Sequence, residues 1–490
     1  MKSYNLPPDA STLMWSTRAI GYTTPSAVAD LIDNSISANA TKVSIQFVSG
    51  EKGYVSILDN GNGMTPEELR MAMKYGSRNP LQERSDTDMG RFGLGLKTAS
   101  LSQCKRLTVV SKKNNKLSAY CWDLDHVLKV DNWELLELEE TELCDLPQIN
   151  KLKCMTEGTI VIWDKLDKIF AGEEDEEKAL LVKIKEVEEH LALTFHRYLQ
   201  GEPGLKKISI TSNGNPIRPQ DPFYITKSDE MPSETIPVQY IGSNGEKEIA
   251  NVIVTPYILP FSDTLSQDEL NALGGKEGLI KNQGFYIYRN KRLIVAADWF
   301  RLARKTDLSK LCRVKVDIPN TLDEIWTIDV KKSMAVPPEI ILKNLRRIIT
   351  PIIRAGKRKY KFRATKETSQ DNLQLWVPSE TRNGIIYSIN PEYPVVKDIM
   401  KDVKDKRKMQ TLLRLLEQNL PVNAIHTDFH DDRKFAFEDV DIAYQNTVNN
   451  LCELLKDVSP EQREEEFNEL MQIMPFAEYE INYSDVEDII

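Results

Sequence analysis

Three short motifs within residues 27–100 constrain the fold of this chain more than any other feature. They read DLIDN at residues 30–34, DNGNGM at residues 59–64 and GRFGLGLK at residues 90–97. Each motif alone is a weak signal, because similar words occur in ordinary helices and turns. Their order and close spacing together favour one nucleotide site built from three neighbouring segments.

The first motif is predicted to lie on a helix. Thr24 can serve as the N-cap, and Pro25 suits the first turn, where its missing N–H costs nothing. Apolar residues then recur at helical spacing, which leaves Asp30, Asp33 and Asn34 close together on another face. Their oxygens suit the orientation of a water molecule and the binding of Mg²⁺. The alternative is an ordinary solvated helix face.

The second motif follows two segments whose alternation predicts paired strands. Asp59 falls at a strand end, and the glycines after it permit positive φ and close approach of a flat ligand. A buried carboxylate there can accept a hydrogen bond from an exocyclic amine. The alternative is a tight hairpin turn, although Thr65 and Pro66 next predict the start of a helix. The candidate contacts are Asp59, Gly61, Gly63 and Met64.

The third motif is a glycine-rich loop predicted to run into a helix. Backbone N–H groups at a helix N-terminus bind anions, and Lys97 adds a positive charge. The glycine spacing differs from that of a Walker loop and of the dinucleotide fingerprint. The candidate phosphate contacts are Gly90, Arg91, Phe92, Gly93, Leu94, Gly95 and Lys97.

In these three motifs the chain resembles the GHKL ATPases, the superfamily of gyrase B, the ninety-kilodalton heat-shock chaperones, histidine kinases and MutL. Within it, the sequence is most similar to MORC-type ATPases and their bacterial relatives. The resemblance is specific over residues 11–165 and weaker over residues 195–365. It implies an α+β chain with a Bergerat-type α/β sandwich that binds ATP, an α/β transducer domain and a C-terminal helical region. The expected domain bounds are 1–175, 176–366 and 367–490.

The resemblance also implies roles for individual residues. Asp59 would take the adenine amino group, Asn34 would hold Mg²⁺, and the third motif would wrap the phosphates. Thr159 matches a threonine that the family places against the adenine, although a strand that starts with Gly-Thr is common in any sheet. Residues 76–89 would form the lid over the nucleotide.

Asp30 departs from the family pattern, in which the general base is usually glutamate. Its side chain is one methylene shorter, so the attacking water must sit closer or the helix must shift. A misplacement of about 1 Å can cost on the order of 100-fold in rate. Slow, Mg²⁺-dependent ATP hydrolysis is therefore expected, with Asp33 as a second carboxylate behind Asp30.

A second catalytic residue is expected from the transducer domain. The family sends a lysine from this domain to the γ-phosphate, and the segment WTIDVKKS at residues 326–333 offers Lys331 and Lys332. Strand alternation points only one of them inward, and Lys332 is preferred. Such a lysine senses the third phosphate and couples its loss to domain movement. The alternative is a pair of exposed lysines at a strand end.

Composition places the chain among proteins of the cytoplasm. Its 490 residues suffice for about three domains. The six cysteines are scattered without a Cys-x-x-Cys pair, which predicts reduced thiols. No apolar run reaches the roughly 18 residues that a membrane span needs.

A basic segment stands out in this chain of net charge −10. Residues 340–366 contain ten lysines and arginines, two interleaved aromatic residues and no acidic residue. This pattern suits contact with a nucleic-acid backbone. The alternative is a basic helix face paired with acidic helices. The candidate DNA contacts are Arg346, Arg347, Arg354 and Arg358.

The region after residue 367 is expected to be a polar linker followed by helices near residues 395–418, 435–455 and 460–474. Residues 460–490 contain ten acidic residues and one basic residue, and such a tail is solvated or docks on a basic partner.

These features together predict a homodimeric clamp that closes on DNA when ATP joins two ATPase domains. Residues 1–24 would strap across to the partner subunit or, equally, pack on their own domain. The alternative function is a chaperone-like or signalling switch that acts on a protein partner through the C-terminal helical region. A role in antiviral defence is an association of MORC-like proteins only.

Overall fold

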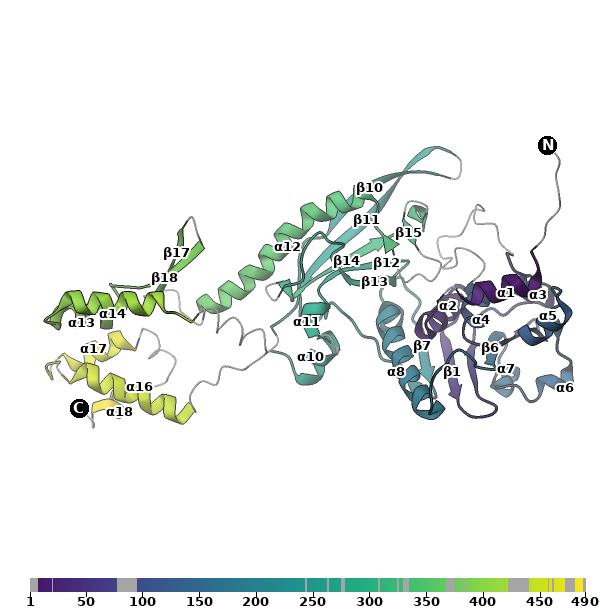
Figure 1. Ribbon diagram of the computed structural model, residues 1–490, viewed down its shortest axis with the longest axis horizontal. Helices are drawn as coiled ribbons and strands as arrows, with labels where there is room; N and C mark the ends of the chain where they lie inside the picture. Colours follow the sequence, from purple (N-terminus) through teal and green to yellow (C-terminus); the bar gives the residue numbers. More distant parts are fainter. Residues whose placement is uncertain are drawn as a thin grey trace. The chain divides into compact units, whose positions relative to one another are not determined.

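The computed structural model divides into two compact units, Met1–Lys357 and Arg358–Ile490, and each is described by itself (Figure 1). No helix in the described part of the chain is both long and apolar enough to cross a membrane. The residues described are 8–19, 21–76, 95–242, 245–261, 264–274, 278–306, 309–323, 326–328, 335–366, 375–381, 384–421, 440–456, 458–460, 462–471 and 481–487.

The first unit begins with an eight-stranded mixed sheet in the order β5-β4-β3-β6-β2-β1-β7-β8. Strands β1 and β7 run parallel, and the other neighbours are antiparallel. Because β7 pairs with β1, the sheet extends beyond residue 175, where the first domain was expected to end. The strands are β1 Lys42–Val48, β2 Tyr54–Asp59, β3 Arg106–Lys113, β4 Lys116–Asp123, β5 Leu136–Glu137, β6 Gly158–Asp164, β7 Ser209–Ser212 and β8 Asn215–Pro216.

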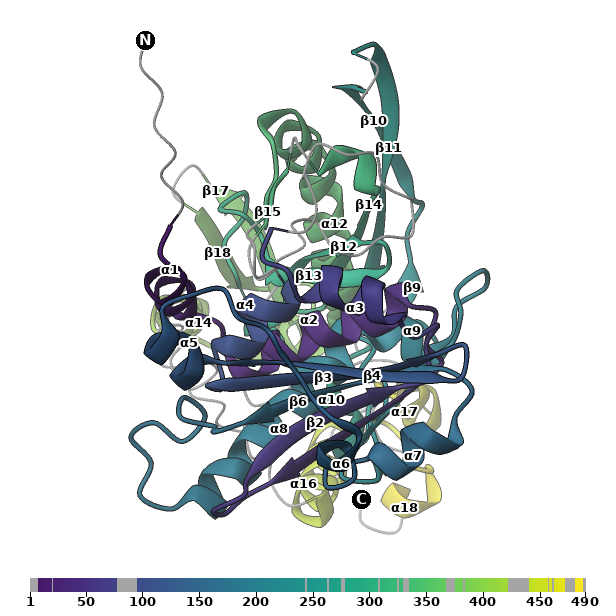
Figure 2. The same ribbon diagram turned by 90° about the vertical axis from the view of Figure 1, so that its right-hand side faces the viewer.

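Helices cover both faces of this sheet, as the predicted α/β sandwich requires (Figure 2). The larger apolar cluster joins one face to α1, α2, α3, α4, α5 and α8. A smaller cluster joins the opposite face to α6 and α7. The helices are α1 Ala10–Arg18, α2 Thr24–Ser37, α3 Pro66–Met73, α4 Gly95–Leu101, α5 Leu124–Val130, α6 Glu140–Leu143, α7 Ile149–Cys154 and α8 Glu176–Thr194.

Helix α2 is capped by Thr23 and not by Thr24. Thr23 Oγ1 accepts a hydrogen bond from the Ser26 N–H at 3.3 Å, and Ser26 Oγ accepts one from the Thr23 N–H at 3.1 Å. The Thr24 hydroxyl donates instead to Gln103 Oε1 at 2.8 Å. Thr23 and Thr24 are both suitable N-cap residues before Pro25. Only their contacts in the folded protein show which of the two caps the helix.

Helix α1 packs on its own domain, which was one of the two alternatives for the N-terminal segment. Ala10 and Met14 are buried in the larger cluster. Arg18 is buried as well, and its Nη2 lies 2.5 Å from Asp167 Oδ1. Residues 1–7 lie outside the described part of the chain, so a strap formed by them stays a prediction.

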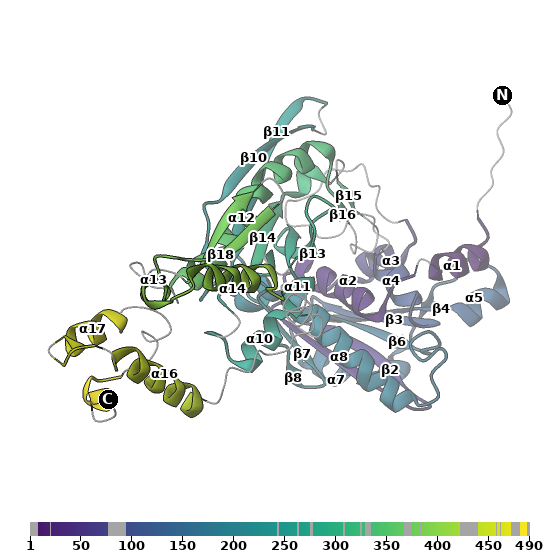
Figure 3. The same cartoon turned by 60° about the vertical axis from the view of Figure 1, so that its left-hand side comes forward.

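A second sheet follows α8 and α9 (His196–Gln200) in the order β10-β11-β14-β12-β13, with β9 paired to β11. Strands β12 and β14 run parallel. Along the chain, helices α10 (Gln267–Gly274) and α11 (Gly278–Lys281) come after β11 and before β12. Helix α8 contacts both α2 and β13 and so lies between the two sheets (Figure 3). The strands are β9 Asp229–Glu230, β10 Glu234–Ile241, β11 Lys247–Ile258, β12 Gly284–Arg289, β13 Arg292–Asp298 and β14 Cys312–Ile318.

The basic segment forms helix α12, Glu339–Lys366, after the short paired strands β15 (Thr327–Ile328) and β16 (Ala335–Val336). One face of α12 is apolar and buried, with Ile341 and Leu345 among its members. Arg346, Arg347 and Arg354 are exposed. This division is the amphipathic pattern of a helix that packs on one side only.

The second unit contains a hairpin where a polar linker was expected. Strands β17 (Trp376–Thr381) and β18 (Gly384–Ile389) are antiparallel. Thr381 is paired with Gly384 where the two strands meet, so the expectation of a polar linker here was wrong. The helices are α13 Pro394–Asp402, α14 Lys406–Gln418, α16 Val440–Leu455, α17 Arg463–Leu470 and α18 Ser484–Glu487.

Candidate functional site

Helix α2 presents the first motif. Asp30 and Asp33 are 3% and 1% exposed, whereas Asn34 is exposed. Asp30 and Asn34 are four positions apart, so their side chains are neighbours on one helix face. The helix therefore combines buried carboxylates with one accessible amide oxygen, which can contact a ligand from outside.

The Asp30 carboxylate faces groups from three other segments. The Tyr22 hydroxyl donates a hydrogen bond to Asp30 Oδ2 at 2.9 Å. Arg292 Nη2 lies 3.8 Å from Asp30 Oδ1. A Cβ atom placed on Gly95 would lie 3.7 Å from Asp30 Oδ2. Because Gly95 begins α4, the first motif and the described end of the third motif lie side by side.

Arg292 is a site residue that the sequence reasoning missed. It begins β13 in the second sheet, and its guanidinium is buried against α2. Its Nε lies 3.0 Å from Asp33 Oδ1 and 2.9 Å from Asp33 Oδ2. The two residues are 259 positions apart, so no local pattern connects them.

Asp59, at the end of β2, is 6% exposed. Its Oδ2 accepts a hydrogen bond from Ser35 Oγ at 3.0 Å, and its Oδ1 accepts one from the Gly61 N–H at 2.8 Å. Burial raises the pKa of Asp59 above its ordinary value of 3.8, and these hydrogen bonds oppose the rise. Ser35 lies on α2, so its hydroxyl joins the first motif to the second.

A row of polar side chains crosses three adjacent strands beside Asp59. Asp59 is opposite Thr159, and Thr159 is opposite Ser111. Ser111 Oγ lies 2.9 Å from Thr159 Oγ1 and accepts a hydrogen bond from the Met64 N–H at 2.8 Å. The structure thus brings together Asp59, Met64 and Thr159. Ser111 was not predicted, because only the strand register places it there.

The glycines of the second motif are required by close backbone packing. Gly63 has φ of 59°, and a Cβ atom there would lie 2.0 Å from Lys112 O. A Cβ atom on Gly61 would lie 2.8 Å from Ala38 O and 2.9 Å from Asp59 Oδ1. Close packing within the protein is therefore sufficient to require glycine at both positions. Their role in the approach of a ligand stays a prediction.

Lys97 is buried and contacts backbone carbonyl groups. Its Nζ donates to Ala72 O at 2.7 Å and to Lys74 O at 2.9 Å, at the C-terminal end of α3. Cations are favourable at that end of a helix. Burial lowers the pKa of Lys97 to about 8. The structure therefore gives Lys97 a role in joining α4 to α3, and its predicted contact with phosphates stays a prediction.

Several predicted site residues lie outside the part of the chain that the structure describes. They belong to the glycine-rich loop, the lid and the phosphate-sensing segment, and their roles stay predictions. These residues are Gly90, Arg91, Phe92, Gly93, Leu94, Lys331, Lys332 and lid residues 77–89.

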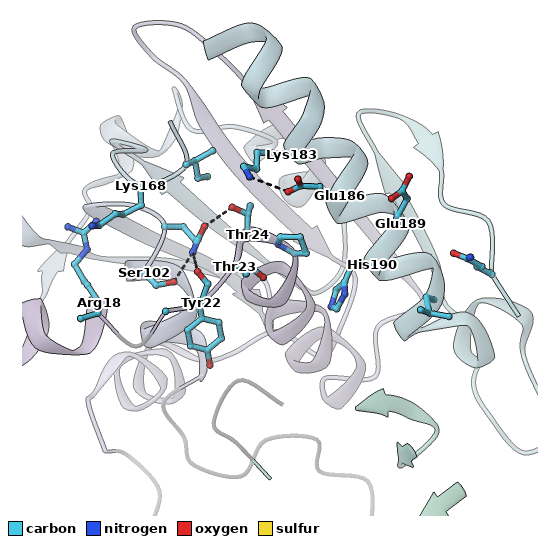
Figure 4. Close-up of a pocket in the computed structure, with 17 residues that line it drawn as sticks. Arg18, Tyr22, Thr23, Thr24, Ser102, Lys168, Lys183, Glu186, Glu189 and His190 are labelled. Atoms are coloured by element: carbon cyan, nitrogen blue, oxygen red, sulfur yellow. Dashed lines mark hydrogen bonds and ion pairs between the residues drawn. The ribbon is translucent and has the colours of Figure 1, made fainter. Parts of the chain in front are cut away.

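A cavity of about 870 Å³ lies at the N-terminal end of α2, between α2 and α8 (Figure 4). Thr23 and Gln103 line it on one side, and Lys183 and His190 of α8 line it on the other. Its lining includes no predicted site residue. Tyr22 connects the two places, because it lines the cavity and its hydroxyl binds Asp30.

Comparison with known proteins identifies the class of this domain. Residues 22–159 match the family model described as histidine kinase-, DNA gyrase B- and HSP90-like ATPase. This segment contains α2, β2 and the start of β6, with the polar groups described above. It is a domain of the GHKL ATPase superfamily, which confirms the resemblance inferred from the three motifs.

Curated proteins similar to part of this chain include DNA mismatch repair proteins MutL. The protein from Thermosipho melanesiensis is 30% identical over 97 residues, which cover 19% of this chain and 18% of the relative. The protein from Shewanella sediminis is 33% identical over 97 residues, covering 19% and 16%. The match thus spans less than a fifth of either relative. A particular similarity to MORC-type ATPases stays a prediction.

Substitution of Gly63 tests the close packing of the second motif. We expect Gly63→Ala to lower the free energy of unfolding by roughly 3 kcal/mol, since it combines a steric conflict with an unfavourable φ. Gly76→Ala is the matched control, because Gly76 has φ of 64° and open space at its Cβ position. It should cost only about 1 kcal/mol. Equal losses in urea unfolding would contradict the assignment.

Proposed function

We propose that the domain at residues 22–159 binds ATP, with Asp59 as the acceptor for the adenine amino group. The observation that carries this proposal is the Asp59 carboxylate, held between α2 and the sheet by Ser35 and the Gly61 N–H. A buried carboxylate is costly unless its oxygens have polar partners. An exocyclic amine is a suitable further donor, and Thr159 lies opposite on the next strand.

We further propose that the domain hydrolyses ATP, with Asp30 as general base. Asp30 lies one helical turn from Asn34, whose exposed amide oxygen suits Mg²⁺. The described residues contain no group of three His, Cys, Asp or Glu that could hold a metal, so most ligands would be phosphate and water oxygens. Mg²⁺ would neutralise phosphate charge. The shorter aspartate supports a slow rate, and Lys332 would sense the γ-phosphate.

Acidification tests the role of Asp59. A non-hydrolysable ATP analogue should bind more weakly as the pH falls, because protonation removes the negative charge that strengthens the hydrogen bond from the adenine amino group. The loss should begin at a higher pH than an ordinary pKa of 3.8 would give, since burial raises the pKa of Asp59. Asp59→Asn should bind roughly tenfold more weakly at pH 7.5.

Titration calorimetry at pH 7.5 and pH 5 measures both effects. Asp164→Asn is the control, because burial also raises the pKa of Asp164. Asp164 ends β6, whereas Thr159, which lies opposite Asp59, is near the start of that strand. Protonation of the analogue's own phosphates affects all three proteins equally. Unchanged affinity in Asp59→Asn would contradict the assignment.

We propose that ATP joins two copies of this chain into a homodimer. The support is the superfamily of the domain, together with the predicted lid and N-terminal segment. The mass in solution should double with the non-hydrolysable analogue in the wild type and remain unchanged in Asn34→Ala. Light scattering measures the mass, with Asn39→Ala as a control at a residue beyond α2. A mass that ignores the nucleotide would contradict gating by ATP.

We propose that the closed dimer acts on DNA through α12. Arg346 and Arg354 are exposed on this helix, while Arg347 Nη2 lies 2.8 Å from Glu234 Oε2. The alternative of a basic face paired with acidic residues therefore has support at Arg347. The name of the MutL relatives, as DNA mismatch repair proteins, also favours DNA.

Binding of the full chain to duplex DNA should weaken steeply with salt. Arg346→Glu with Arg354→Glu should weaken binding and reduce the slope of log affinity against log salt by about two units, or 0.9 per lost phosphate contact. Lys406→Glu with Arg407→Glu on α14 is the control of equal charge. Fluorescence anisotropy measures both, and equal effects of the two pairs would contradict a specific role for α12.

The second candidate is a switch that acts on a protein partner. Leu412, Leu415 and Leu416 on α14 are each 51% exposed, and exposed apolar side chains on one helix suit a protein contact.

The free thiols of all six cysteines support a cytoplasmic location. The likeness to MORC-type ATPases and a role in antiviral defence stay predictions.

A further inference from the structure

Arg292 begins β13, directly after a two-residue turn of the second sheet. Asn290 and Lys291 join β12 to β13, and both have positive φ, of 49° and 64°. Two-residue turns of this kind match the twist of the paired strands and fix their register. The Tyr198 hydroxyl donates to Asn290 O at 2.6 Å. Arg292 is paired with Arg289 across this turn. The turn therefore defines the backbone position of Arg292.

The Arg292 guanidinium spans two carboxylates on α2. Its Nε lies 3.0 Å and 2.9 Å from the two oxygens of Asp33, and its Nη2 lies 3.8 Å from Asp30 Oδ1. All three side chains are at least 95% buried. Two buried carboxylates repel each other and lose solvation, and a buried cation between them offsets both costs. The planar guanidinium also restricts their directions.

Asp30 is thus oriented from two sides. The Tyr22 hydroxyl binds Oδ2 at 2.9 Å, and Arg292 faces Oδ1. Tyr22 comes from the segment before α2, whereas Arg292 comes from the second sheet. The direction of the Asp30 carboxylate therefore depends on contact between that sheet and α2.

We propose that Arg292 is a positioning residue for ATP hydrolysis. Its proposed action is through Asp33 and Asp30 and not on the nucleotide itself, which distinguishes it from the lysine predicted to sense the γ-phosphate. Docking of the second sheet on α2 orients Asp30 toward its water, and undocking releases it. This inference rests on the proposed ATPase function.

The test is steady-state ATP hydrolysis by the full chain. Arg292→Met should lower kcat by roughly 10- to 100-fold, because a displaced base loses its alignment with the water. KM should stay within about threefold, since nucleotide binding does not involve Arg292. Arg292→Lys should recover part of kcat, because an ammonium restores the charge but not the planar geometry.

Arg197→Met is the matched control for loosening of the contact between the sheets. Arg197 is buried to the same extent as Arg292, and its Nη1 lies 2.6 Å from Asp317 Oδ1 on β14. Its other ionic partner is Glu202. This variant should keep kcat within about twofold of the wild type. A loss equal to that of Arg292→Met would show that general loosening, and not Asp30, is responsible, and would overturn the proposal.

Arg292→Met with Asp33→Asn separates positioning from folding. The pair removes both charges together, so its melting temperature should exceed that of Arg292→Met. Its kcat should remain low, because Asp30 still lacks the contact from Arg292 and keeps only that from Tyr22. Recovery of kcat to the wild-type value would overturn the proposal, as would an unchanged kcat in Arg292→Met. A wild type that does not hydrolyse ATP would show failure of the proposed ATPase function itself. An Asp30→Asn variant as fast as the wild type would show that Asp30 is not the base.

Discussion

The burial of helix α2 is the constraint on which the rest of the first unit depends. Ala27, Val28 and Ile32 pack into the apolar cluster with no exposed surface. A helix enclosed in this way must satisfy its carboxylates within the protein, because water cannot reach them. Tyr22 and Arg292 do so, and the second sheet is thereby tied to the domain that carries the three motifs. The same helix leaves Asn34 open to a ligand.

Local patterns were sufficient to predict much of this domain from its sequence. The apolar spacing of α2 and the alternation of β2 depend on neighbours a few positions apart. The capping box that Thr65 forms with Glu68 depends on residues three apart. The end of β2 at Asp59 follows from the motif that comes after it. Each signal lies within one element, so a single sequence contains it in full.

Contacts between distant segments could not be predicted in this way. Ser111 joins the site through the register of β3 with β6, and that register is set by the whole sheet. Strand β7 pairs with β1 from a position 167 residues later, because an uncovered edge would leave backbone groups unpaired. The contacts of Lys97 with the end of α3 are also tertiary, and its place after a glycine-rich loop did not reveal them.

The aspartate at position 30 gives the contact from Arg292 its significance. A carboxylate one methylene shorter than glutamate reaches less far, so its position is set more strictly by the backbone of α2. Asp33 lies one turn along the same helix and is bound at both oxygens by Arg292 Nε. A buried ionic contact of this kind is costly to break in place, so β13 and α2 are expected to move together. A short base on a helix held by a second sheet makes the proposed chemistry depend on the contact between the two sheets.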